Sequence, residues 1–361
     1  MAKLAPREYT GGQVRRPARQ FIGAYMAIGT DNTAGPLELR DVPCDFCGSA
    51  EADLVMTGRD RFCGLPGEFR VVACRRCGLT RTNPQPTIAT IGAAYPEGYT
   101  LHREELRPAG EPAGLVRWAL VNLRGYPLGR RSPAPLRWLL WPRAALALRN
   151  RRNVGYLAYE GGGRLLDYGC GIGKYVAEMA AAGWRAEGMD LVPQAVAAGR
   201  AAGLDLRVGT MPGTAIESER YDLVTMWHVL EHVPSPRATL EAIRGILRPG
   251  GRVALVCPLS DSLAARLFGP AWYGLDLPRH LTHFTRATLR RHLEAAGLAV
   301  ERERCIRRPT FFTRSYGYLS EDTGRPLHRR LARSHFAARL ASHLALAAGR
   351  TDEALFVARR A

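Results

Sequence analysis

The sequence predicts an α/β domain with a doubly wound, mainly parallel sheet, preceded by a small cysteine-rich module. Three observations lead to this fold class. From residue 164 onward, short apolar stretches alternate with helical stretches, which is the pattern of a parallel sheet with helices on both faces. A glycine-rich turn follows the first of these apolar stretches. Nearer the N-terminus, four cysteines form two close pairs.

Seven strands and four main helices are expected in the α/β part. The strands are 164–168, 185–189, 204–208, 221–226, 252–257, one that begins at 298, and 353–359. The helices are 174–182, 194–202, 237–247 and 285–296. The predicted organisation is a loose arm at 1–40, a zinc-ribbon-like module at 41–82, a helical linker or lid at 83–160, and a domain at 161–361 with a basic helical insertion at 309–350.

Composition limits the class of protein. The chain has 361 residues, 46% of them hydrophobic, which is enough for a real core and excludes wholesale disorder. There is no secretion signal and no apolar stretch of the roughly 20 residues that span a bilayer. We therefore expect a reducing cytoplasmic location, where paired cysteines favour metal over disulfide.

The formal net charge is +18. Residues 113–152 contain nine arginines and no acid, and residues 323–350 contain six arginines and no acid. Such blocks suit a membrane surface, a nucleic acid or a phosphorylated substrate, or are simply solvated faces. Trp118, Trp138 and Trp141 lie among the first block, which favours an interfacial membrane contact and a peripheral place at the inner membrane face. The alternative is that these helices cover the catalytic domain.

The paired cysteines are Cys44 with Cys47 and Cys74 with Cys77, each pair in the pattern C-x-x-C-G. Two intervening residues let both sulfurs of a pair meet one ion, and four thiolates close a tetrahedral structural site. The spacing therefore predicts structural zinc, and Cys63 is expected to be a core thiol.

The glycine-rich turn contains Gly169, Gly171 and Gly173, and Asp167 stands two residues before it. This G-x-G-x-G spacing differs from the G-x-G-x-x-G of dinucleotide sites. A carboxylate at Asp167 suits a cationic ligand, and Asp190 at the end of the second strand suits the ribose of a nucleoside.

These motifs, together with YDLV…HVLEHV at 221–233 and RPGG at 248–251, resemble class I S-adenosylmethionine-dependent methyltransferases. The resemblance extends from Arg164 to the C-terminus. It implies that Asp167 and the three glycines hold the methionine part of S-adenosylmethionine, that Asp190 holds the ribose, and that residues 209–211 flank the adenine. The cofactor residues implied are Asp167, Gly169, Gly171, Gly173, Asp190, Leu191, Met211 and Trp227.

The order of C-x-x-C-G, C-x-x-C-G-L and N-P-Q-P, followed by Tyr95 and Tyr99, resembles a bacterial methyltransferase group with an N-terminal zinc module. Members commonly modify sugars, cell-surface glycans or secondary metabolites. The resemblance implies a small-molecule, glycan-linked or lipid-linked acceptor, with O-methylation favoured and N- and C-methylation open. The alternatives are a nucleic-acid methyltransferase or binder, disfavoured because no Asn-Pro-Pro-Tyr-type motif follows the fourth strand, and a cofactor-binding scaffold without catalysis.

Four histidines are candidates for the general base. His228, Glu231 and His232 are spaced to share one helical face, and His228 or His232 is preferred. His280 and His283, in the long loop PRHLTHF, are their rivals. The segment 228–233 also resembles the corresponding segment of ubiquinone-pathway O-methyltransferases, which can hold a divalent metal through carboxylate and His ligands. This chain has His228 at the position where a Glu is expected. Residues 228–232 also match the H-x-x-E-H motif of inverted zinc proteases. Their position just after the fourth strand argues against a protease.

Overall fold

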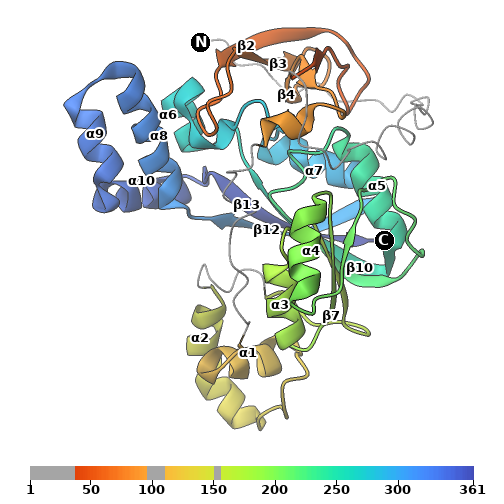
Figure 1. Ribbon diagram of the computed structural model, residues 1–361. Helices are drawn as coiled ribbons and strands as arrows, with labels where there is room; N and C mark the ends of the chain where they lie inside the picture. The colour runs from red at the N-terminus through yellow and green to blue at the C-terminus, as the bar shows by residue number, and fades with distance from the viewer. Residues whose placement is uncertain (1–36, 96–109, 150–155) are drawn as a thin grey trace.

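The computed structural model describes residues 37–95, 110–149 and 156–361 (Figure 1). The arm expected at 1–40 lies outside the described residues except for its last four. Of those four, Leu39–Arg40 forms the short strand β1 and pairs with β5 (Gln85–Pro86).

A seven-stranded sheet forms the centre of the molecule, in the order β12-β13-β10-β9-β6-β7-β8. All neighbours are parallel except β13, which is antiparallel to both β10 and β12. The predicted fold class is confirmed. The strands are β6 (Arg164–Tyr168), β7 (Arg185–Asp190), β8 (Leu206–Val208), β9 (Tyr221–Trp227), β10 (Leu247–Pro258), β12 (Leu298–Ile306) and β13 (Glu353–Arg360).

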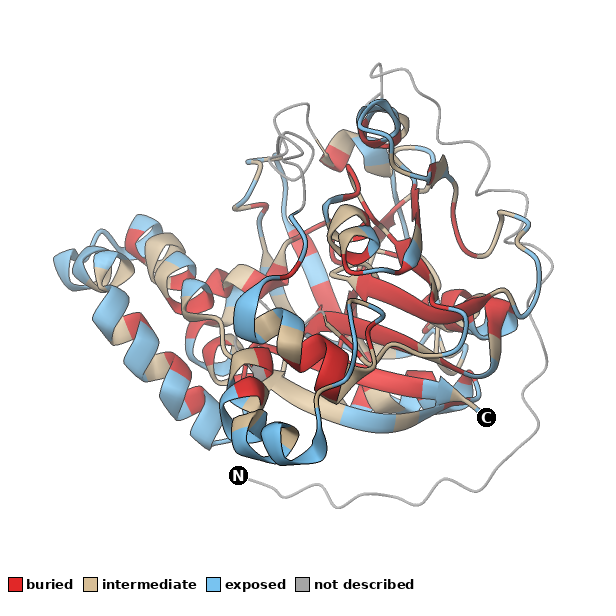
Figure 2. Cartoon of the chain, turned by 90° about the horizontal axis from the view of Figure 1, so that it is seen from below, coloured by how far each residue is buried: buried red, intermediate tan, exposed pale blue. Residues whose placement is uncertain are grey.

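Helices cover both faces of this sheet, so its middle strands are almost entirely buried, as the red strands of Figure 2 show. On one face lie α3 (Lys174–Ala181) and α4 (Pro193–Ala201), and on the other α5 (Pro236–Ile246) and α7 (Arg286–Ala295). Pro193 and Pro236 each begin a helix, where proline's missing N–H costs nothing. The predicted elements of this part are confirmed to within a few residues.

A second, four-stranded sheet lies over the edge where the parallel strands end. Its order is β11-β4-β3-β2, from β2 (Ala52–Gly58), β3 (Phe69–Cys74), β4 (Thr80–Thr82) and β11 (Thr282–His283). The first three strands belong to residues 41–82, which contain the four paired cysteines and are called the cysteine segment below. The fourth comes from the long loop that follows β10, together with α6 (Leu263–Phe268) and two single 3₁₀ turns, η5 (Gly269–Ala271) and η6 (Tyr273–Leu275).

The region predicted as a helical linker contains the short 3₁₀ turn η2 (Ile91–Ala94) and two helices, α1 (Gly114–Arg124) and α2 (Ala134–Arg149). They lie at the opposite edge of the sheet from the cysteine segment (Figure 1). Pro142 lies inside α2, away from its first turn. Ala144 and Leu148 are buried against α1 in a shared core, and this packing offsets the roughly 3 kcal/mol that an internal proline costs.

Three helices lie between β12 and β13, within the segment predicted as a basic insertion. They are α8 (Pro309–Thr323), α9 (Pro326–Arg333) and α10 (His335–Ala347). They project from one side of the sheet (Figure 1). Among the described residues, no helix has the length and apolar character needed to cross a bilayer.

Candidate functional site

The glycine-rich turn joins β6 to α3 at the carboxyl edge of the sheet. Gly169, Gly171 and Gly173 have φ values of 77°, 54° and 86°, which glycine adopts at little cost. A Cβ atom on Gly169 would lie 2.3 Å from Cγ2 of Val229. A Cβ atom on Gly171 would meet nothing within 4 Å, so the turn leaves open space beside its backbone, as a closely held ligand requires.

Two acids support this turn. The carboxylate of Asp190 accepts the amide N–H of Gly171 (2.7 Å) and that of Val192 (2.9 Å). Asp167 is buried beneath the turn and accepts the hydroxyl of Thr225 at 2.7 Å. Burial, with the acids Asp190 and Glu178 adding to its effect, raises the pKa of Asp167 to about 7. A bound ammonium or sulfonium would supply a cation that stabilises the ionised form.

The other residues expected at the cofactor surround the same turn. Trp227 ends β9 and packs edge-on against Tyr175 with ring centroids 5.2 Å apart. Its indole N–H is buried and finds no acceptor in the described part of the chain. Leu191 is exposed, whereas Met211 is buried, and the Tyr168 hydroxyl accepts its amide N–H at 3.1 Å. The open turn, the buried acid and the unsatisfied indole fit a cationic nucleoside such as S-adenosylmethionine.

His228 lies between two carboxylates. Its Nδ1 is 3.3 Å from Oε1 of Glu231, and its Nε2 is 3.2 Å from Oε1 of Glu353. Burial alone would lower its pKa, but Glu353 and Glu231 outweigh burial and raise the pKa of His228 to about 10. His228 is therefore an imidazolium near neutral pH, and it has no free nitrogen with which to accept a proton.

His232 and His280 each meet a backbone carbonyl instead of a carboxylate through Nδ1. Nδ1 of His232 lies 3.1 Å from the carbonyl oxygen of Arg279, and Nδ1 of His280 lies 3.0 Å from that of Gly274. Carbonyl oxygens only accept hydrogen bonds, so Nδ1 carries the proton in each ring. In the neutral form, Nε2 of each ring then carries the lone pair. Burial, with His232 and His283 nearby, lowers the pKa of His280 well below its usual value, which keeps this ring neutral.

The fourth histidine, His283, is held by Thr82. The Thr82 hydroxyl donates its only proton to the carbonyl of His280 (2.7 Å), so it accepts from Nε2 of His283 at 3.0 Å. Burial lowers the pKa of His283 to about 4. The nitrogen of His283 that meets Thr82 is thus a donor, and the ring ties β11 to β4.

Glu231, His232 and His280 form a compact group whose ligand atoms lie within 4.8 Å of one another. The His232 and His280 rings are 4.6 Å apart, edge to face. One carboxylate and two imidazoles, each imidazole oriented by a backbone carbonyl, are a donor set that divalent metals accept. The same lone pairs can also take a proton from a substrate hydroxyl.

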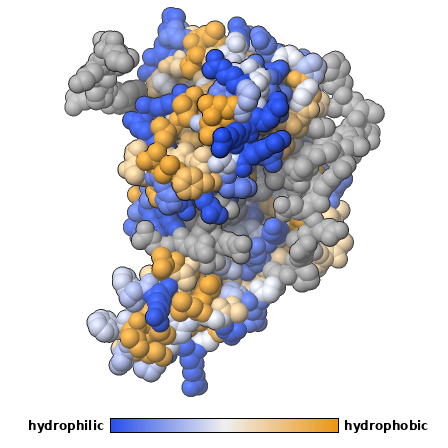
Figure 3. All heavy atoms as spheres, turned by 90° about the vertical axis from the view of Figure 1, so that its left-hand side faces the viewer, coloured by the Kyte–Doolittle hydropathy of each residue, from blue (hydrophilic) through white to orange (hydrophobic). Residues whose placement is uncertain are grey.

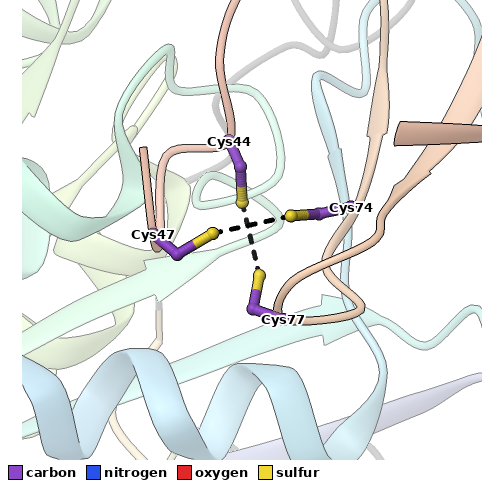
Figure 4. A group of neighbouring side chains, drawn as sticks. All are labelled: Cys44, Cys47, Cys74 and Cys77. Atoms are coloured by element: carbon purple, nitrogen blue, oxygen red, sulfur yellow. Dashed lines mark hydrogen bonds between the residues drawn. The ribbon is translucent and has the colours of Figure 1, made fainter. Parts of the chain in front are cut away.

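The sulfurs of Cys44, Cys47, Cys74 and Cys77 point toward a common centre (Figure 4). Sγ of Cys44 is 3.4 Å from that of Cys77, Sγ of Cys47 is 3.5 Å from that of Cys74, and all four lie within 4.8 Å of one another. Zinc–sulfur bonds of about 2.3 Å in a tetrahedron place sulfurs about 3.8 Å apart. The four residues predicted as zinc ligands are therefore together and fit that ion.

The cysteine segment also holds the loop that carries His280. Arg279 is fully buried, and its guanidinium donates to Asp60 at 2.6 and 3.0 Å and to Asp276 at 2.7 Å. The backbone follows the same course: the carbonyl of Leu281 accepts the amide of Thr82 (3.0 Å), and the amide of Leu281 donates to the carbonyl of Glu231 (2.8 Å). Glu231 and His280 thus reach their places through the cysteine segment.

Sequence reasoning missed three residues of this site: Glu353, Tyr95 and Arg279. Tyr95 places its hydroxyl 3.0 Å from Nδ1 of His232. Glu353 begins β13, and because β13 is antiparallel to β10, its start lies beside the end of β10 at Pro258. An acid at the start of an antiparallel last strand is a usable signal for Glu353. Arg279 belongs to the loop PRHLTHF and Tyr95 follows the N-P-Q-P motif, but the sequence gave neither of them an individual role.

Comparison with known proteins agrees with this geometry. A family model described as a methyltransferase domain matches residues 143–303. A ubiquinone biosynthesis O-methyltransferase of Xanthomonas oryzae pv. oryzae is 35% identical over 134 residues, which are 34% of this chain and 55% of that protein. This chain thus spans little more than half the length of that curated relative. The ubiquinone biosynthesis O-methyltransferase of Paraburkholderia phytofirmans is 31% identical over 180 residues, which are 47% of this chain and 71% of that protein.

A crystal structure of an S-adenosylmethionine-dependent methyltransferase from Mesorhizobium loti aligns with a TM-score of 0.40 at 21% identity, covering 61% of this chain and 97% of that one. The sheet order and the family matches together define the class: the chain belongs to the S-adenosylmethionine-dependent methyltransferases.

Proposed function

We propose that this protein transfers the methyl group of S-adenosylmethionine to a hydroxyl group, on a sugar, a glycan-linked or a secondary-metabolite acceptor, with a histidine as general base. The observation that carries the proposal is the pair of imidazoles beside Glu231, each of which meets a backbone carbonyl through Nδ1 and leaves Nε2 free of a carbonyl partner. The segment that bears His232 contacts the glycine turn through Val229, so the bases adjoin the cofactor site. The curated relatives above, named for O-methylation, support a hydroxyl acceptor.

His232 is the base that the geometry favours. It is half-buried and therefore more accessible to an acceptor than His280 or His283, both of which are buried. His228, one of the preferred candidates from sequence, is held as an imidazolium by Glu231 and Glu353. We assign His228 to charge balance between these two acids.

In the proposed mechanism, bound S-adenosylmethionine supplies a methyl group activated by its sulfonium. The acceptor oxygen forms a bond to the methyl carbon while the carbon–sulfur bond breaks, and Nε2 of His232 takes the hydroxyl proton. The Arg279 carbonyl keeps the proton of Nδ1 in place during this transfer, which fixes the basic nitrogen. Glu231 then lies close enough to stabilise the imidazolium that forms.

Two metal roles belong to the proposal. The four cysteines would hold a structural zinc, which closes the sheet that includes β11. As the alternative to a His232 base, Glu231, His232 and His280 would hold a divalent cation, which would lower the pKa of an acceptor hydroxyl in place of proton transfer to His232. A metal count per chain, followed by assay after a mild chelator, separates these roles, because a closed four-cysteine site gives up its ion far more slowly.

The test starts with calorimetric titration of the purified protein with S-adenosylmethionine and, separately, with NAD. We expect micromolar binding of the first ligand only. Tritiated methyl transfer is then screened over sugar nucleotides, glycans and phenolic metabolites, with RNA and DNA as parallel acceptors. Label in a hydroxyl acceptor supports the proposal. Label only in nucleic acid, or cofactor binding without transfer to any acceptor class, would overturn it in favour of the two alternatives.

A further inference from the structure

The outer face of α2 exposes several large apolar side chains. Trp138 is 83% exposed, Leu146 is 70% exposed, and Leu139 and Trp141 are also exposed. The opposite side of the helix is anchored, because Ala144 and Leu148 are buried against α1. A contiguous group of large apolar side chains in water marks an interaction surface rather than ordinary scatter.

A similar arrangement recurs on α10. Its small residues Ala338, Ser342 and Ala345 face inward and are buried, whereas Phe336, Leu340 and Leu344 are exposed. The exposed residues are spaced four apart, so they form one stripe along the helix. A helix that buries its small residues and exposes its large apolar ones has the reverse of the usual amphipathic order. Phe336 is 78% exposed, which the fold itself does not require.

Both helices carry cations around these apolar residues. Exposed arginines near them are Arg130, Arg131 and Arg143 beside α2, and Arg329, Arg330, Arg333 and Arg339 on α9 and α10. Within the described residues, no carboxylate forms an ion pair with any of these seven, and the helices α1, α2, α9 and α10 contain no acid. The helices α2 and α10 both lie toward the left-hand side of Figure 1, and Figure 3 shows that apolar and hydrophilic side chains are mixed on this side of the molecule.

We propose that α2 and α10 form a docking surface for an anionic lipid bilayer. Exposed tryptophan, phenylalanine and leucine ringed by arginine suit the boundary between acyl chains and charged headgroups. The charge of the surface selects acidic lipids. The helices are too short to cross a bilayer, so the contact is peripheral.

The test is co-sedimentation of the full chain with vesicles, without cofactor or acceptor. Vesicles of phosphatidylcholine alone are compared with vesicles that contain 3 parts phosphatidylcholine to about 1 part phosphatidylglycerol. We expect binding to the anionic vesicles, weaker binding as sodium chloride is raised, and a blue shift of tryptophan emission. Trp138→Ala with Trp141→Ala, and separately Phe336→Ala with Leu340→Ala, should each lower the partition coefficient at least about tenfold.

Leu54→Ala with Val55→Ala is the matched control. These residues on β2 are also exposed but lie beside Asp53 and Glu51, and their loss should leave partition unchanged. Circular dichroism melting shows that each variant is folded. Absence of binding to anionic vesicles by the folded chain would overturn the proposal. Two other results would overturn it as well. One is self-association, without vesicle binding, that the α2 or α10 variants abolish; the other is binding to RNA without binding to vesicles. Because no methyl transfer is measured, failure here leaves the proposed reaction untouched.

Discussion

The proposed cofactor side and the proposed acceptor side of this site are built in different ways. The cofactor side is built around a turn and two acids within residues 167–190, and Asp190 accepts the backbone amides of Gly171 and Val192. The acceptor side joins Thr82, Tyr95, Glu231, His280 and Glu353, which come from five distant segments. The first side depends on local backbone conformation, whereas the second depends on long-range contacts that the cysteine segment maintains. Damage to either side should therefore leave a distinct signature.

The largest expected effect separates the two sides directly. His232→Gln removes the proposed base while keeping a group that can donate to the Arg279 carbonyl. We expect kcat to fall by about 10²- to 10⁴-fold, with affinity for S-adenosylmethionine unchanged. His328→Gln, on exposed α9 surface near neither side, serves as control. Steady-state kinetics and calorimetry on the same preparations give both quantities. Equal loss of affinity in the His232 variant would contradict the division into two sides.

The next effect concerns the buried pair that holds the acceptor loop. Asp60→Ala leaves the guanidinium of Arg279, which is fully buried, without one of its two carboxylates. Stripping one partner from a buried ion pair costs about 3–5 kcal/mol. Chemical denaturation should show this loss. Asp53→Ala, which breaks the exposed pair with Arg75, should change stability by less than about 1 kcal/mol. Similar losses in both variants would show that the Asp60–Arg279 pair has no special role.

On the cofactor side, Gly169→Ala combines a φ of 77° with a Cβ 2.3 Å from Val229. Strain of about 1–3 kcal/mol at such a position should weaken S-adenosylmethionine about 10- to 100-fold. Gly171→Ala has the same backbone strain but open space, so it tests whether ligand occupies that space: a loss as large as that of Gly169→Ala is the expected result. Calorimetry measures both, and unchanged affinity in the Gly171 variant would place the ligand elsewhere.

The smallest effect is a pH dependence of cofactor affinity. Burial raises the pKa of Asp167 to about 7, so below that pH the acid is mostly protonated and neutral. A cationic ligand favours the carboxylate, and binding therefore releases a proton. Affinity should strengthen as pH rises from 6 to 8, by at most about tenfold per unit. In Asp167→Asn this part of the slope disappears, while titration of the ligand itself remains. Identical slopes for the two proteins would exclude Asp167 as the partner of the cation.

The same division explains what could be predicted from sequence. The strands and the mainly parallel sheet follow from the alternation of apolar and helical stretches, and the turn at Gly169 is recognisable because all its residues are adjacent. The C-x-x-C pairs are equally local, and their convergence followed from metal chemistry. The role of Glu353 depends on an antiparallel last strand, and β11 is only two residues long. Neither leaves a periodic pattern. His228 looked like a base because its carboxylate neighbour Glu353 lies 125 positions away in the chain.

The pairing of β11 with β4 bears on how such enzymes could exchange parts during evolution. The cysteine segment supplies Asp60, and the loop 276–283 supplies Arg279 and the edge strand that meets it. A recombination event that replaced the cysteine segment alone would leave the buried guanidinium of Arg279 without Asp60 and would remove β4, the partner of β11. Thr82 of β4 and His283 of β11 are 201 positions apart in the sequence, but they are hydrogen-bonded and their strands pair. The cysteine segment and the loop should be inherited as a single unit, and grafting a new acceptor preference onto this scaffold requires both to be moved together.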